Sequence, residues 1–302
     1  MLDPIQLKAI PLPNGELIGY REAGNGQETL LLIHGNNASS KHWDILMESL
    51  LNDYTVIAVD LRGFGISTYD APIRAIKDFA DDLYAFVSTL NLKDFTIAGW
   101  SMGGAVAMSF LVNYPDYAKK LILIESIGIK GYPVHKKDEK DKGINEEYLV
   151  TEEDLVDDSV IKSIIDANKH KDRTKLKDIW CRLVYNFSQP NKEQFERYLD
   201  DMLTQRNLDD VYDALHRFNI SKEPNGVVKG TGEVDHINIP TLVIHGEEDL
   251  VIPIEAALEL KDALGHLANL VVFKNCGHSP LVDALEELVF NIKSFINNTS
   301  TD

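Results

Sequence analysis

The chain has 302 residues, of which 44% are hydrophobic and 26% charged, as in an ordinary soluble globular protein with a large core. Acidic residues outnumber basic ones, 48 to 30, and the formal net charge of -18 disfavours nucleic-acid partners and integral membrane association. Cys181 and Cys276 lie far apart and predict no disulfide framework. The opening segment lacks the pattern of a signal peptide, and no apolar run approaches the roughly 18 residues that would span a membrane, so we expect a cytoplasmic protein.

The first part of the chain predicts strands that alternate with helices. Asn14-Gly15, between two apolar stretches, predicts a β-hairpin. Continuously apolar runs, typical of strands buried on both faces, then alternate with segments of helical periodicity. The runs are ETLLLIHG, YTVIAVDLRG, DFTIAGW and KLILIES; the helical segments are SKHWDILMESLLN, IKDFADDLYAFVSTLN and MGGAVAMSFLVNYP. This alternation predicts an α/β fold whose mostly parallel, doubly wound sheet is covered by helices on both faces.

The alternation stops between residues 127 and 235. This region starts with a densely charged stretch, 135–158, for which we expect a solvated surface, and continues with segments of helical periodicity. The strand pattern then returns in PTLVIHGEED and LANLVVFKNCG, and an amphipathic helix closes the chain. We therefore predict one α/β core, residues 1–126 and 236–302, with a helical cap (lid) inserted at residues 127–235.

Three polar residues follow predicted strands of the core and form a candidate catalytic triad: Ser101, Asp249 and His278. In an open parallel sheet, functional groups gather beyond the carboxyl ends of the strands. Ser101 lies in a G-x-S-x-G motif between a strand and a helix, and the order Ser, Asp, His is that of hydrolases with a nucleophile elbow. A serine hydroxyl needs an adjacent base, and a carboxylate fixes the tautomer of a histidine base and stabilises its charged form.

An acyl-transfer site also needs two N–H donors for the oxyanion. We expect them from Met102, at the start of the helix after the serine, and from Asn36, in the turn after LLLIHG. Other residues compete for the remaining roles: His245 and His266 for the base, and Glu125, Glu247 and Glu248 for the acid. We expect Cys276 to be a packing residue.

The segments LLIHGNNASSKHWDILMESL, VIAVDLRGFGIS, IAGWSMGGAVAM, VIHGEEDLVIP and CGHSP together resemble the α/β-hydrolase superfamily. The resemblance implies that Asp60 and Arg62 tie loops together, and that the insertion is the family's cap. It implies neither cofactor nor metal. The GWSMGG box, with this length and no signal peptide, further resembles the intracellular poly(3-hydroxybutyrate) depolymerases of bacilli. That resemblance implies a serine ester hydrolase that works through an acyl-enzyme on a neutral ester or polyester and releases 3-hydroxybutyrate, with the polymer granule surface as a partner.

The same box also occurs in other members of the superfamily, so alternatives stay open. They are a small-molecule carboxylesterase, an enol-lactonase, a carbon–carbon bond hydrolase, and a signalling receptor that binds a ligand with negligible turnover. Carbon–carbon hydrolases act on anionic acids and would need a basic anchor, for which Arg182 and Arg217 are candidates. Trp100, Trp180 and Phe187 are the candidate pocket residues; Trp180 and Phe187 share one face of a predicted helix, which either grips the substrate or packs the cap onto the core.

Overall fold

The computed structural model describes residues 4–137, 143–149 and 151–298. Its main feature is an eight-stranded sheet with the strand order β1-β2-β4-β3-β5-β6-β9-β10. β1 and β2 form the predicted antiparallel hairpin, β2 also pairs antiparallel with β4, and all other pairs are parallel. The strands are Gln6–Pro11 (β1), Leu17–Ala23 (β2), Thr29–Ile33 (β3), Thr55–Val59 (β4), Phe95–Trp100 (β5), Ala118–Ile124 (β6), Thr241–Gly246 (β9) and Ala268–Phe273 (β10). The predicted α/β fold class is confirmed.

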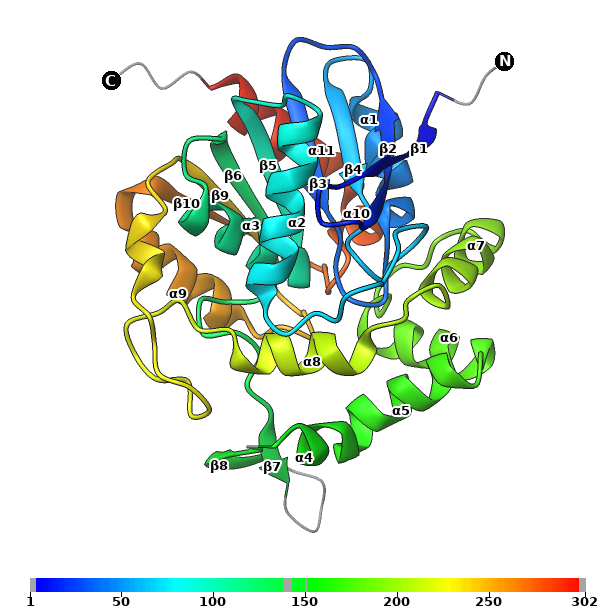
Figure 1. The fold of residues 1–302 in the computed structure, drawn as a ribbon, viewed down its shortest axis with the longest axis vertical. Helices are drawn as coiled ribbons and strands as arrows, with labels where there is room; N and C mark the ends of the chain where they lie inside the picture. Colours follow the sequence, from blue (N-terminus) through cyan, green and yellow to red (C-terminus); the bar gives the residue numbers. More distant parts are fainter. Residues whose placement is uncertain (1–3, 138–142, 150, 299–302) are drawn as a thin grey trace.

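Helices cover both faces of the sheet, with α2, α3 and α9 on one side and α1 and α11 on the other (Figure 1). Alternate residues of each central strand enter opposite cores: Leu31 and Ile33 of β3 face α2 and α3, whereas Leu30 and Leu32 face α1. This period of two explains why the strands are apolar throughout. The helices are Asp44–Leu50 (α1), Ile76–Thr89 (α2), Met102–Asn113 (α3), Ile254–Leu264 (α9), Pro280–Asp283 (α10) and Leu285–Asn297 (α11).

A mostly helical insertion separates β6 from β9 and lies beyond the carboxyl ends of the parallel strands (Figure 1). Part of the charged stretch pairs into a small antiparallel sheet, and residues 138–142 and 150 of that stretch lie outside the described residues. The elements are His135–Lys137 (β7), Gly143–Tyr148 (β8), Glu152–Asp157 (α4), Ser159–Lys169 (α5), Arg173–Leu183 (α6), Lys192–Met202 (α7), Leu208–Arg217 (α8) and the 3-10 helix Glu233–His236 (η2). The boundaries of the cap domain at 127 and 235 stay a prediction.

The loop after β4 is fixed by Asp60 and Arg62, as the resemblance implied. Asp60 accepts hydrogen bonds from the backbone N–H groups of Ser40 (2.8 Å) and Ile66 (3.0 Å), and so ties two loops together. Arg62 donates two hydrogen bonds to the carboxylate of Asp82 on α2. Within the described parts of the chain, no helix has the length and apolar character needed to cross a membrane.

Candidate active site

Ser101 occupies a sharp turn between β5 and α3. Its backbone has φ 55° and ψ -121°, a conformation that is costly for a residue other than glycine and recurs at functional sites. The turn is held from both sides, because the Ser101 N–H donates to the carbonyl of Ile124 (3.0 Å) and its carbonyl accepts from the N–H of Ile127 (3.1 Å). A Cβ on Gly103 would lie 2.1 Å from the carbonyl oxygen of Ile33, so this position must be glycine for α3 to pack against β3.

His278 and Asp249 are in direct contact. The Nδ1 atom of His278 lies 2.7 Å from Oδ2 of Asp249, and both side chains are almost fully buried. The other oxygen of Asp249 accepts hydrogen bonds from the N–H groups of Val251 (2.7 Å) and Ile252 (3.0 Å). Burial opposes the charge of Asp249, but its bonds to His278 and Val251 outweigh burial and hold its pKa below the usual range. An ionised Asp249 fixes the Nδ1–H tautomer of His278, and Nε2 can then accept a proton.

Trp100 connects the loop of His278 to the turn of Ser101. Its indole Nε1 donates a hydrogen bond to the carbonyl of His278 (2.8 Å), and the two rings lie 5.8 Å apart between centroids. Since Trp100 immediately precedes Ser101, the loop of His278 is held beside the serine turn. Ser101, Asp249 and His278 therefore come to the same edge of the sheet from three different strand ends.

The turn after β3 lies against Ser101. A Cβ built on Gly35 would be 3.1 Å from Cβ and 3.6 Å from Oγ of Ser101, so Asn36 follows directly after a residue that lies against Ser101. His34 fixes the turn: its Nδ1 donates to the carbonyl of Gly35 (2.8 Å) and its Nε2 accepts from the N–H of Leu61 (3.0 Å). Met102 is the first residue of α3, and its N–H has no acceptor within the helix. Both amides that we expect to bind an oxyanion thus belong to segments that meet at Ser101.

The rival residues occupy other environments. His266 is exposed in a 3-10 helix before β10, at the amino end of that strand, whereas His245 is buried and bonds through Nε2 to the carbonyl of Ile252 (3.0 Å). Glu247 and Glu248 are exposed. Cys276 is fully buried, and burial raises the pKa of its thiol well above the usual range, so it stays protonated and unreactive. Both cysteines are free thiols.

Glu125 lies behind the predicted acid. It follows β6, is completely buried, and its Oε1 accepts a hydrogen bond from the N–H of Gly246 (2.7 Å). Donor atoms of Glu125, His245 and Asp249 lie within 4.8 Å of one another. They do not form a complete ligand set for a cation, because both oxygens of Asp249 already have partners in His278 and the backbone.

The candidate pocket residues differ in placement. Trp100 and Trp180 are buried and meet edge to face with ring centroids 6.4 Å apart, which joins α6 to β5. The prediction that Trp180 and Phe187 share one face of a helix is wrong, because α6 ends at Leu183. Phe187 lies in the following loop and is 41% exposed. Arg182 and Arg217 are exposed, and Arg217 pairs with Asp213 on its own helix.

Two groups near the site were not predicted from the sequence. Gln205, in the insertion, hydrogen-bonds to the turn of Asn36 and Asn37. His42 is buried between Trp180 and Tyr198, and its Nδ1 lies 3.2 Å from the Asp201 carboxylate. No motif distinguishes these residues in the sequence, because their positions depend on how the insertion packs on the core.

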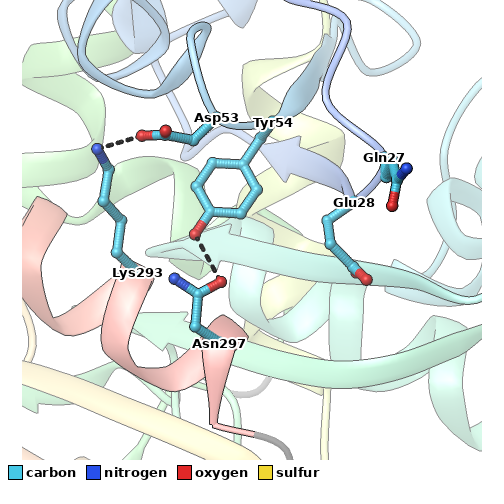
Figure 2. Close-up of a pocket in the computed structure, with 6 residues that line it drawn as sticks. All are labelled: Gln27, Glu28, Asp53, Tyr54, Lys293 and Asn297. Atoms are coloured by element: carbon cyan, nitrogen blue, oxygen red, sulfur yellow. Dashed lines mark hydrogen bonds and ion pairs between the residues drawn. The ribbon is translucent and has the colours of Figure 1, made fainter.

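A separate cavity of about 450 Å³ is lined by Gln27, Glu28, Asp53, Tyr54, Lys293 and Asn297 (Figure 2). Glu28 and Tyr54, which line it, directly precede β3 and β4, so the cavity opens at the amino ends of these strands. Lys293 of α11 reaches across it to Asp53 (2.5 Å). Such an ion pair at the surface contributes little, and the lining residues contain no candidate nucleophile–base pair.

The family model described as the alpha/beta hydrolase fold matches residues 28–285. The chain belongs to this family. A curated relative is the 2-hydroxy-6-oxo-6-(2'-aminophenyl)hexa-2,4-dienoic acid hydrolase of Metapseudomonas resinovorans, 27% identical over 92% of this chain and 87% of that protein. Lipase 3 of a Moraxella species is 26% identical over 96% of this chain and 84% of its own length.

Among solved structures, this alpha/beta hydrolase is similar to an esterase from Exiguobacterium antarcticum, with a TM-score of 0.75, 21% sequence identity, and coverage of 97% of this chain and all of that one. At this identity the similarity shows the fold alone. The family model makes the chain a hydrolase by family, and its curated relatives include a dienoic acid hydrolase and a lipase.

Proposed function

We propose that this protein is a serine hydrolase that cleaves small, neutral carboxylic esters through an acyl-enzyme. The observation that carries the proposal is the 2.7 Å contact between His278 Nδ1 and the buried Asp249 carboxylate, beside the strained turn of Ser101. The three residues have the roles of nucleophile (Ser101), base (His278) and acid (Asp249).

The first step follows from these contacts. His278 Nε2 takes the proton from Ser101 as Oγ attacks the ester carbonyl, and Asp249 stabilises the imidazolium that forms. The negative charge on the former carbonyl oxygen is bound by the N–H groups of Asn36 and Met102, and the amino end of α3 favours it further. His278 then gives its proton to the departing alcohol.

Hydrolysis of the acyl-enzyme repeats the sequence with water. His278 accepts a proton from water, the hydroxide attacks the acyl carbonyl, and the proton returns to Ser101 as the acid leaves. Trp100 helps this cycle because its bond to the His278 carbonyl keeps the loop of the base in one position. The chemistry needs no group beyond these residues and water.

The preference for a neutral substrate rests on charge. The side chains of Arg182 and Arg217, the candidate anchors for an anionic acid, are both exposed, and Arg217 is paired with Asp213. Trp100 packs against the rings of Trp43, Trp180 and His278, which offer no positive side chain to an anion. With a net charge of -18, the protein also attracts anionic substrates poorly.

A second candidate function is carbon–carbon bond hydrolysis, which the curated relative from Metapseudomonas resinovorans favours. The same nucleophile, base and oxyanion donors would serve that reaction. Polyester depolymerisation, to which the GWSMGG box pointed, ranks third, because the curated relatives described above are a dienoic acid hydrolase and a lipase.

One set of assays separates these functions. Turnover is measured on p-nitrophenyl acetate and butyrate, on a 2-hydroxy-6-oxo-dienoic acid, and on amorphous 3-hydroxybutyrate polymer granules. We expect efficient ester turnover that is lost in Ser101→Ala and kept in Ser109→Ala, a matched change of a buried serine in α3, the helix that follows Ser101. Faster cleavage of the dienoic acid, or of the granules, would replace the ester proposal, and ester turnover that survives in Ser101→Ala would refute the assigned nucleophile.

A further inference from the structure

Behind the Asp249–His278 pair lies a second buried carboxyl group, that of Glu125. Its side chain is completely buried, and its backbone has φ 43°, in the left-handed region that is costly for residues other than glycine. At the end of β6, a carboxylate oxygen of Glu125 lies within 4.8 Å of one of Asp249, and Oε1 is fixed by the N–H of Gly246 (2.7 Å).

The other oxygen of Glu125 faces groups that cannot donate a hydrogen bond to it. Oε2 lies 3.3 Å from Nδ1 of His245 and receives no hydrogen bond from the described residues. His245 Nε2 lies 3.0 Å from the carbonyl of Ile252, which can only accept, so Nε2 carries the hydrogen of a neutral imidazole. Nδ1 then presents a lone pair to Glu125, and the neighbouring carboxylate of Asp249 is also an acceptor.

If Glu125 were ionised, its buried Oε2 would face two other hydrogen-bond acceptors, His245 Nδ1 and the Asp249 carboxylate, and no donor among the described residues. A protonated Glu125 removes the conflict, because its O–H can donate to Asp249, with His245 Nδ1 as a second acceptor. Burial, and next the charge of Asp249, raise the pKa of Glu125 well above its usual range, which agrees with this arrangement. Burial likewise lowers the pKa of His245 and favours its neutral form.

We infer that Glu125 is a positioning residue of the proposed catalytic site: a neutral carboxylic acid that donates a hydrogen bond to the Asp249 carboxylate and holds it toward His278. The effect of Glu125 on the reaction rate rests on the proposed function. The protonated state of Glu125 rests on the structure alone. Acidic residues thus follow both β6 and β9. Asp249, after β9, contacts His278, and Glu125, after β6, holds Asp249 in place.

Several other titratable groups surround Glu125 and contribute to the electrostatic potential at its carboxyl group. They come from β9, from the loops that follow β9 and β10, and from α10. These groups are His245, Asp249, Cys276, His278 and Asp283. Since Asp249 is the ionised member nearest to Glu125, a second ionised carboxylate there would be strongly disfavoured.

The decisive measurement is infrared spectroscopy at pH 7.5, which detects the C=O band of a protonated carboxyl group and its shift in D₂O. We expect such a band in the unmodified protein and in Glu247→Gln, an exposed control in the loop after β9, and its absence in Glu125→Gln. The absence of the band from the unmodified protein, or its persistence in Glu125→Gln, would overturn the inference whether or not the protein hydrolyses esters.

Kinetics then test the positioning role. Gln is neutral and can still donate to Asp249, so Glu125→Gln should keep the acid limb of the pH profile of kcat/KM. Glu125→Met fills similar space without a donor, and its kcat should fall about tenfold or more with KM little changed. A displacement of the acid limb to lower pH in Glu125→Gln would mean that a negative charge had been removed, and would overturn the inference even if Glu125→Met fails to fold.

Discussion

Gln205 of the insertion accepts a hydrogen bond from the backbone N–H of Asn37 at 2.9 Å, in the turn that carries the expected oxyanion donor. Its amide nitrogen donates to the Asn36 side chain (2.8 Å) and to Asn207 (3.0 Å). Asn37 has φ 53°, in the left-handed region, which asparagine adopts more readily than most residues other than glycine. One buried amide thus links the insertion to the segment that we expect to stabilise the transition state.

We predict that Gln205→Ala lowers kcat for a short ester about tenfold or more and changes KM little, because the Asn36 amide loses its fixed direction. Steady-state kinetics on p-nitrophenyl acetate provide the measurement. Gln27→Ala, an exposed glutamine at the cavity of Figure 2, is the control and should behave like the unmodified enzyme. Equal kcat values for Gln205→Ala and the control would show that the turn needs no support from the insertion.

Gly35→Ala should slow catalysis by up to about 100-fold at nearly unchanged stability. The added methyl would lie 3.1 Å from Ser101 Cβ, and a small displacement of the nucleophile is costly. Gly128→Ala is matched, since its methyl would lie 3.2 Å from the Cβ of Ala256. Thermal unfolding and kcat are compared for both variants; an equal loss of kcat in both would mean that crowding at Ser101 is not the cause.

Glu125 should make the protein less stable as the pH rises. Below its ordinary pKa of 4.5 the group is protonated in both the folded and the unfolded chain. Above that value the unfolded chain releases the proton and the folded chain retains it, so the free energy of unfolding falls by up to about 1.4 kcal/mol per pH unit. Urea unfolding between about pH 5 and about pH 8 should therefore show Glu125→Gln gaining stability relative to the unmodified protein; parallel curves would contradict the raised pKa.

Trp180→Ala should destabilise the protein by about 3–5 kcal/mol, because the ring is buried against Trp100, His42 and Tyr185. We expect kcat/KM to fall by the same factor for acetate and longer acyl esters, as for a residue that packs the insertion onto the core. Phe187→Ala, at an exposed position, should change neither quantity much. A loss that grows with acyl length would instead assign Trp180 to substrate binding.

The core could be predicted because its signals are local. Continuously apolar runs predicted β3 to β6, and in the structure their residues alternate between the two cores. The Asn14-Gly15 turn predicted the hairpin, and helical periodicity predicted the helix after Ser101. The positions of Ser101, Asp249 and His278 after strands placed them at one edge of the sheet. These predictions depend only on local patterns and on which residues directly follow each strand in the sequence.

The contacts of Gln205, His42 and Glu125 could not be predicted in this way. Gln205 reaches Asn37 across 168 residues, and Glu125 bonds to Gly246 across 121 residues. Their roles come from packing between distant segments, and a buried glutamate has no sequence signal that separates it from an exposed one. The end of α6 at Leu183 was also missed, because apolar residues continue to Phe187 after the helix stops.

The bond from Gln205 to the turn of Asn36 and Asn37 has a consequence for how such proteins diverge. An insertion beyond the strand ends looks like a part that relatives could exchange to acquire new substrates. Here the exchange would also remove the Gln205 amide that fixes the turn beside Ser101. A chimera with a foreign insertion would keep Ser101 and His278, but the backbone amide of Asn36 would lose its fixed direction. A foreign insertion would therefore have to supply its own hydrogen-bond partners for the turn of Asn36 and Asn37.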